Sequence, residues 1–217
     1  MNSIRPELFP IPPMVAELPV DDRGYPVPWF VAWVDGRPEF RLSASSKIRA
    51  AMTEGRCWVC GQKRGLDMAF VIGPMCSVNR ISAEPPSHLE CALFAVRACP
   101  FLSKPHMRRR TEGMPEKSPN APAPGVMIER NPGVAAVWET LTYSAYPDNG
   151  GWLFKVGTPR RVLWFAEGRP ATRAEVLASI ESGLPALRAL AAGPRDLAEL
   201  DRLTLAAHQY LPAEASA

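Results

Sequence analysis

Hydrophobic and polar positions alternate in two parts of the chain, and each part predicts a small β-structure. In the stretch WFVAWVDGRPEFRL, aromatic and β-branched residues flank Asp35-Gly36, a pair typical of a two-residue hairpin turn. The next segment, SASSKIRAAMTEG, predicts a short helix with serine capping options that ends at Gly55. Further along, the runs GVAAVWETLTY, GWLFKVG and RRVLWFAEG predict three strands.

Helical signals dominate the end of the chain. In TRAEVLASIESG, Thr172 and Glu175 have the spacing of a capping box, and Gly183 predicts the end of that helix. Pro185 then predicts the first turn of another short helix, and Pro194 precedes a last one that continues to about Tyr210. The fold class expected is α+β, with an N-terminal hairpin and a small antiparallel sheet followed by C-terminal helices.

A proline-rich segment, SKPHMRRRTEGMPEKSPNAPAPG, interrupts these patterns and contains few apolar residues. Such a composition is typical of a linker or an exposed arm. We therefore expect three parts. Residues 1–102 hold the hairpin and a cysteine-rich module, residues 103–125 form a basic linker, and residues 126–217 form a C-terminal α+β part.

Composition places the chain among ordinary globular proteins, since 47% of its 217 residues are apolar and 22% are charged. The first residues, MNSIRPELFPIPPMVAEL, lack the basic start of a signal peptide and contain four prolines. No apolar run approaches the roughly 18 residues that a membrane span needs. The expectation is a cytoplasmic protein without membrane contact, in a compartment where thiols stay reduced.

Cysteine spacing gives the clearest chemical signal, because all five cysteines lie between positions 57 and 99. Such clustering without a secretory signal favours metal binding over disulfides. Cys57 and Cys60 are separated by two residues and followed by Gly61, an arrangement in which two thiolates grip one ion from a tight turn. A redox motif is the rival interpretation, but no strand here leads directly into a helix that starts at the two cysteines.

The second pair of ligands has to come from the segment PPSHLECALFAVRACP or from Cys76. Ser87 and Glu90 have capping-box spacing, so Ser87 is the expected N-cap. His88 and Cys91 are then three positions apart, on one helical face and separated by a rise of about 4.5 Å. Cys99 would lie about 12 Å along the helix from Cys91, too far to share a zinc ion.

The expected metal ligands are therefore Cys57, Cys60, His88 and Cys91, with a set that includes Cys76 as the alternative. A histidine in this position favours zinc over an iron–sulfur cluster, although such a cluster stays an alternative. A site with four protein ligands is structural, because it leaves no open position for a substrate.

A knuckle, a β-hairpin and a helix whose first turn supplies the second ligand pair resemble the treble-clef zinc finger, over residues 55–100. That class includes nucleic-acid binders, protein binders and HNH-type nucleases. The nucleases need a histidine base on the hairpin, and residues 61–87 contain none. The polar candidates there are Asp67, Asn79 and Glu84, so a divergent nuclease is the least favoured function. No catalytic residue is assigned.

The whole chain also resembles an uncharacterised family of bacteriophages and prophages of high-GC bacteria. The stretches that carry this resemblance are PVPWFVAW, CWVCG, FVIGPMC, EPPSH, CPFL and EGRPATRAEVLASIESGLP. The resemblance implies a phage accessory protein that acts in the host cytoplasm. It implies no mechanism.

Charge is unevenly distributed, although the net charge is only +3. Residues 55–110 carry 9 basic and 3 acidic residues, whereas residues 1–54 carry 6 and 7, and residues 111–217 carry 10 and 12. This excess indicates an anionic partner, although a solvated basic surface is an equal alternative. The function expected is zinc-stabilised binding of nucleic acid, with modulation of a host defence or transcription protein as the alternative and no small-molecule substrate evident. The candidate contact residues are Lys63, Arg64, Arg80, Lys104, Arg108, Arg109 and Arg110.

Overall fold

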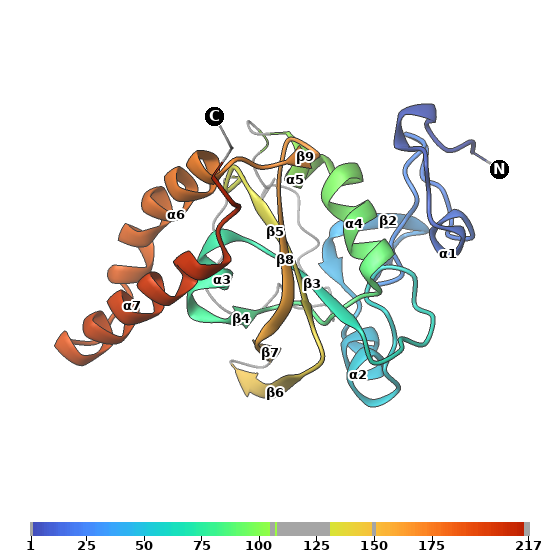
Figure 1. Cartoon of the computed structure of the whole chain (residues 1–217). Helices are drawn as coiled ribbons and strands as arrows, with labels where there is room; N and C mark the ends of the chain where they lie inside the picture. The colour runs from blue at the N-terminus through green and yellow to red at the C-terminus, as the bar shows by residue number, and fades with distance from the viewer. Residues whose placement is uncertain (1, 105–106, 108–130, 149–150, 215–217) are drawn as a thin grey trace.

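The computed structural model describes residues 2–104, 107, 131–148 and 151–214. In this part of the chain the protein is a mixed α+β structure with small antiparallel sheets and C-terminal helices (Figure 1), so the predicted fold class is confirmed. The helices are α1 (Pro13–Ala16), α2 (Ser45–Thr53), α3 (Pro74–Asn79), α4 (Leu89–Ala98), α5 (Pro100–Ser103), α6 (Arg173–Arg188) and α7 (Pro194–Ala207), with 3-10 turns η1 (Pro6–Leu8) and η2 (His208–Tyr210). The strands are β1 (Val31–Val34), β2 (Arg37–Ser43), β3 (Met68–Ile72), β4 (Ile81–Ser82), β5 (Ala135–Thr140), β6 (Tyr143–Asp148), β7 (Gly151–Val156), β8 (Pro159–Ala166) and β9 (Arg169–Pro170).

The N-terminal hairpin forms as its turn sequence predicts. Strands β1 and β2 pair antiparallel, with Val34 opposite Arg37 across the turn. Asp35 and Gly36 have φ angles of 48° and 74°, the positive values that a type I′ turn requires at both central positions. The hairpin is a separate two-stranded sheet.

The larger sheet has the strand order β3-β5-β8-β9 and combines one strand from before residue 103 with three strands from after residue 125. Phe70 of β3 lies opposite Trp138 of β5, so a strand from the cysteine-rich part pairs with the C-terminal part. Helix α4 packs its Ala92 and Val96 on one face of this sheet. The predicted division at 103–125 stays a prediction, because most of that segment lies outside the described residues.

The smaller sheet, β4-β7-β6, contains the strand β6, which the sequence pattern did not predict. The run GVAAVWETLTY was expected to form one strand, but β5 ends at Thr140, and the last residue of the run, Tyr143, begins β6, which belongs to a different sheet. Thr140 explains the break. Its hydroxyl donates to the Thr158 carbonyl (2.9 Å) and accepts from the Thr142 amide (3.3 Å), so the chain turns there.

Helix α6 starts as predicted but ends later. The Thr172 hydroxyl and the Glu175 carboxylate form both hydrogen bonds of a capping box. The helix does not end at Gly183, and Pro185 opens no new helix, because α6 continues to Arg188. Gly183 is buried against α3, where an added Cβ would lie 2.7 Å from the Met75 sulfur, so this glycine gives room for packing. The last predicted helix is confirmed as α7 and η2.

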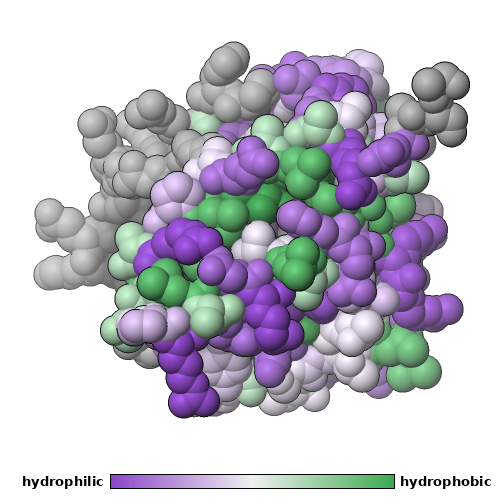
Figure 2. All heavy atoms as spheres, turned by 60° about the vertical axis from the view of Figure 1, so that its left-hand side comes forward, coloured by the Kyte–Doolittle hydropathy of each residue, from purple (hydrophilic) through white to green (hydrophobic). Residues whose placement is uncertain are grey.

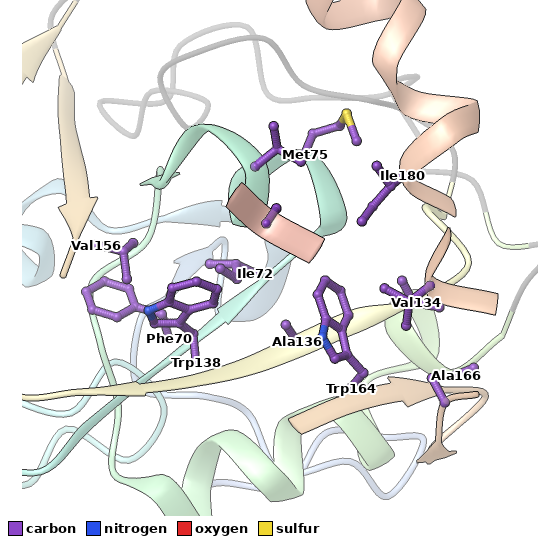
Figure 3. Packing of buried hydrophobic residues seen from close by; sticks show 14 of the residues in the cluster. Phe70, Ile72, Met75, Val134, Ala136, Trp138, Val156, Trp164, Ala166 and Ile180 are labelled. Carbon is purple, nitrogen blue, oxygen red and sulfur yellow. The ribbon is translucent and has the colours of Figure 1, made fainter. Parts of the chain in front are cut away.

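The main hydrophobic core lies between the larger sheet, the smaller sheet and the helices α3, α6 and α7 (Figure 3). Trp138 is fully buried in it, and its indole nitrogen donates to the Gly157 carbonyl (2.9 Å). Helices α6 and α7 both contact α3. Seen from the side on which α6 and α7 lie in Figure 1, the surface shows hydrophobic patches among hydrophilic side chains (Figure 2). Among the described residues, no helix combines the length and apolarity needed to cross a membrane.

Candidate metal centre

Cys57 and Cys60 lie in a tight turn that is closed by backbone hydrogen bonds. The Cys57 amide donates to the Gln62 carbonyl (2.8 Å), and the Gly61 amide donates to the Cys57 carbonyl (2.9 Å). The Cys60 amide points at the Cys57 sulfur, 3.5 Å away. Gly61 has a φ of +76°, so glycine lets the chain reverse here as predicted. Both thiols therefore face the same side of the turn.

Helix α4 supplies the other two donors, but it begins one residue later than predicted. Ser87 is not the N-cap; that position is taken by His88. The amide and carbonyl of Ser87 both pair with Ala69 of β3, at 2.8 and 2.9 Å, and this pairing holds Ser87 in extended backbone. The His88 amide is consequently outside the helix, where it points at the Cys57 sulfur at 3.3 Å. Cys91 lies in the first turn, three residues after His88, as expected.

The four predicted donors form one cluster. The sulfurs of Cys57, Cys60 and Cys91 and a ring nitrogen of His88 all lie within 4.8 Å of one another. The His88 Nδ1 atom is 3.4 Å from the Cys60 sulfur and 3.9 Å from the Cys91 sulfur. Zinc–sulfur bonds of about 2.3 Å and zinc–nitrogen bonds of about 2.05 Å place such atoms about 3.6 Å apart in a tetrahedron. The two distances bracket this value, so the cluster is the right size for one metal ion.

The second ring nitrogen of His88 fixes the orientation of the imidazole. Its Nε2 atom lies 3.2 Å from the backbone carbonyl of Lys63. A carbonyl only accepts, so Nε2 is the donor of this contact and Nδ1 is the ring nitrogen that faces the sulfurs, where the neutral ring could bind a metal ion. Metal-binding histidines commonly donate their other N–H to a carbonyl in this way.

Burial and mutual contact perturb the three thiols. Cys57 and Cys91 are fully buried, and Cys60 is 8% exposed. Hydrogen bonds from the Cys60 and Cys91 thiols hold the pKa of Cys57 far below its ordinary value. The same contact with Cys57 raises the pKa of Cys60 to about 11 and also raises the pKa of Cys91. The cluster thus favours a single thiolate unless a cation offsets the repulsion, and a divalent metal ion would supply that charge.

The other two cysteines lie elsewhere. Cys76, the alternative ligand, is in α3 and packs against the main core, and burial raises its pKa to about 11. Cys99 lies between α4 and α5, where burial also raises its pKa. The donor cluster of the described residues includes neither thiol. Both are partly buried, and the exclusion of Cys99 from the cluster agrees with its spacing from Cys91 along the helix.

The predicted basic residues divide into three groups. Lys63 and Lys104 are exposed, and their ammonium groups have no partner among the described residues. The guanidinium groups of Arg64 and Arg80 instead form hydrogen bonds within the protein. Arg64 donates to the Arg56 and Ala51 carbonyls, whereas Arg80 donates to the Gly157 carbonyl and the Tyr210 hydroxyl and stacks over Trp138 at 4.4 Å. Arg108, Arg109 and Arg110 lie outside the described residues.

Two of the three polar residues considered for a nuclease are engaged in contacts within the protein. The Asn79 side-chain oxygen accepts from the Ile81 amide (3.0 Å), and Asp67 pairs with Arg160 (2.8 Å). Glu84 is exposed in the loop after β4, and the donor cluster of the described residues includes neither carboxylate. The expected hairpin between the two ligand pairs is also altered, because α3 lies between β3 and β4 and the two strands enter different sheets.

Sequence reasoning missed the segment that covers the cysteines. Residues 8–18, here called the strap, pack five apolar side chains against the buried cluster that contains Cys57, Cys60 and Cys91. A signal for this was present, because these side chains recur at helix-like intervals that prolines interrupt. They are Leu8, Ile11, Met14, Val15 and Leu18.

Comparisons with protein-family models, curated proteins and solved structures return no match to this chain.

Gly61 provides a test of the knuckle. An added Cβ would lie 2.5 Å from the Trp29 ring, and the positive φ already disfavours any other residue. We expect Gly61→Ala to destabilise the protein by about 2–4 kcal/mol, from left-handed backbone strain and overpacking together. Thermal denaturation of the metal-loaded protein measures this. Gly65→Ala is the matched control, since nothing lies within 4 Å of its added Cβ, and equal effects would contradict the steric account.

Proposed function

We propose that this chain is a zinc-binding, non-enzymatic phage accessory protein that binds nucleic acid in the host cytoplasm. The charge distribution carries the proposal. Residues 55–110, which contain the metal ligands, hold 9 basic and 3 acidic residues, and Lys63 and Lys104 are exposed. A nucleic-acid backbone is an anionic surface that such a region attracts.

The donor set supports zinc as the metal. Three thiolates and one imidazole at single-ion spacing match the ligands and the size of a structural zinc site. Four protein donors fill a tetrahedral coordination sphere and leave no position for a substrate or an activated water. Two hollows of the described part, of about 230 and 490 Å³, are open to solvent and lined by none of the donors. These observations favour binding over catalysis.

Salt-dependent binding tests the proposal. Zinc-loaded protein is titrated into fluorescent single-stranded DNA, duplex DNA and RNA, and anisotropy is followed between low and physiological salt. We expect affinity to fall steeply with salt on at least one of them. Lys63→Glu and Lys104→Glu should each weaken binding across sequences and reduce the salt slope by about 1.

Lys155→Glu serves as the control, because Lys155 is an exposed lysine on β7 outside the basic region. It should leave the salt slope unchanged. Absence of binding to all three probes at low salt would remove nucleic acid as the partner.

Exposed apolar side chains favour a second candidate, modulation of a host protein. Leu66 is 86% exposed in the loop after the knuckle, and Trp33 is 49% exposed on β1. Large exposed apolar residues are common anchors at protein interfaces. Capture of a defence or transcription protein from host lysate, lost on Leu66→Asp or Trp33→Asp but retained by Lys155→Glu, would support this candidate.

A further inference from the structure

The cysteine side of the metal centre is covered by the N-terminal strap. Val15, in α1, is fully buried and belongs to the same cluster as Cys57, Cys60 and Cys91. Leu8, Ile11, Met14 and Leu18 pack around it and are partly buried. In Figure 1 this segment lies beyond α4, at the edge of the molecule farthest from α6 and α7.

The opposite side of the centre is more open. His88 is only partly buried, and its Nε2 atom meets the carbonyl of the exposed Lys63. Two routes to the sulfurs therefore exist. One passes the imidazole, which would have to leave the metal, and the other opens when the strap moves away.

The strap is attached mainly by apolar contact. Its backbone hydrogen bonds are local, such as those from the Val15 amide to Pro12 and from the Leu18 amide to Val15. Within the described residues, no strand ladder joins positions 8–18 to the knuckle or to α4. A polar contact to the knuckle joins Gln62 and Glu17 at 3.1 Å, and it is exposed. The strap can therefore separate from the cysteines without disrupting a sheet or a helix.

The segment that precedes the strap is held by contacts away from the metal centre. The Arg5 amide donates to the Gly24 carbonyl (3.1 Å), and the Arg5 guanidinium lies 5.3 Å from the centre of the Tyr25 ring. The strap is thus fixed at a point away from the cysteines. Residues 8–18 can lift while the segment before them stays attached.

We propose that the strap controls how fast the metal ion exchanges with solution by closing the cysteine side of the site. Val15 is the central residue of this closure, because it is the fully buried strap side chain in contact with the cysteine cluster. The proposal concerns the residues around the metal and does not depend on nucleic-acid binding.

Transfer of zinc to excess chromophoric chelator measures the exchange rate. We expect zinc-loaded, full-length Val15→Ser to lose its metal at least tenfold faster than the unaltered chain, while still binding one equivalent at equilibrium. Leu8→Ser and Ile11→Ser, at the partly buried rim, should give smaller accelerations in the same direction. Ile4→Ser is the control, since Ile4 is a partly buried N-terminal residue outside the cysteine cluster. It should stay within twofold of the unaltered rate.

A second readout is alkylation of Cys57, followed by mass spectrometry, which should accelerate in the same order. An unchanged rate in Val15→Ser would overturn the proposal and indicate release past His88. Equal acceleration by Ile4→Ser would overturn it too, because general loosening would then explain the effect. Should Val15→Ser fail to fold, Leu8→Ser decides, and a rate within twofold of the unaltered chain would count against the strap.

Discussion

Replacing Cys91 with serine is expected to abolish stoichiometric metal binding and to cost about 4 kcal/mol of stability or more, as loss of a structural metal commonly does. For a chain of this length, that corresponds to a fall in Tm of about 8–16 °C. The reason is geometric. Cys91 is fully buried among Cys57, Cys60 and His88, so its loss leaves a three-donor site inside a cluster that the strap closes. Metal analysis of the purified protein and thermal denaturation measure both effects.

The other cysteines provide matched controls. Cys76→Ser and Cys99→Ser should each retain one equivalent of metal, because neither thiol belongs to the donor cluster. His88→Ala should lose metal as Cys91→Ser does. Retention of a full equivalent by Cys91→Ser, or its loss in Cys76→Ser, would refute the ligand assignment. The same metal analysis distinguishes zinc from iron.

Trp138→Ala is expected to destabilise the protein by about 3–5 kcal/mol, the usual cost of deleting a buried aromatic side chain. Trp138 is fully buried, and its ring contacts the Arg80 guanidinium at 4.4 Å and the Tyr210 ring at 4.9 Å. Removing it opens a cavity and deletes the ring contact between the larger sheet and Tyr210. The midpoint of urea denaturation measures the loss.

Two comparisons sharpen this prediction. Trp138→Phe should cost less, about 2 kcal/mol, for the lost hydrogen bond and the void beside the smaller ring, and Gly157 still accepts from Arg80. Trp152→Ala, at a tryptophan that is 37% exposed on β7, should cost about 1 kcal/mol or less. Equal losses at Trp138 and Trp152 would show that the core does not depend on Trp138 as described.

Local signals were the part of the structure that the sequence predicted well. Asp35-Gly36 predicted its hairpin turn, and Thr172 with Glu175 predicted the start of α6, because each depends on a few neighbouring residues. The cluster of four candidate metal donors was also predictable, since the spacing within each pair places both side chains on one side of a turn or helix. The capping-box spacing wrongly placed the N-cap of α4 at Ser87. That spacing describes only neighbouring residues, whereas Ser87 pairs with Ala69 of β3 and is held in extended backbone.

Features that depend on distant contacts were not predictable. Gly183 carries the signal of a helix end, yet Met75 packs against it and the helix continues. Arg80 was predicted to be a surface cation, but its guanidinium stacks on the rings of Trp138 and Tyr210, which are more than 50 positions away in the sequence. The end of β5 at Thr140 and the start of β6 at Tyr143 likewise depend on distant contacts, because the two strands pair in different sheets.

Strands β3 and β4 lie between the two pairs of candidate ligands and join different sheets. A metal ion bound by both pairs would therefore lower the conformational entropy of the unfolded chain in this segment. Cys60 and His88 are 28 positions apart, whereas Arg80 and Gly157, which meet beside the smaller sheet, are 77 positions apart. Closing the shorter loop costs about 1 kcal/mol less by the logarithmic dependence on loop length. A bound metal ion acts as a reversible cross-link around β3, α3 and β4. Such a cross-link removes unfolded conformations of the segment that supplies one strand to each of the two sheets.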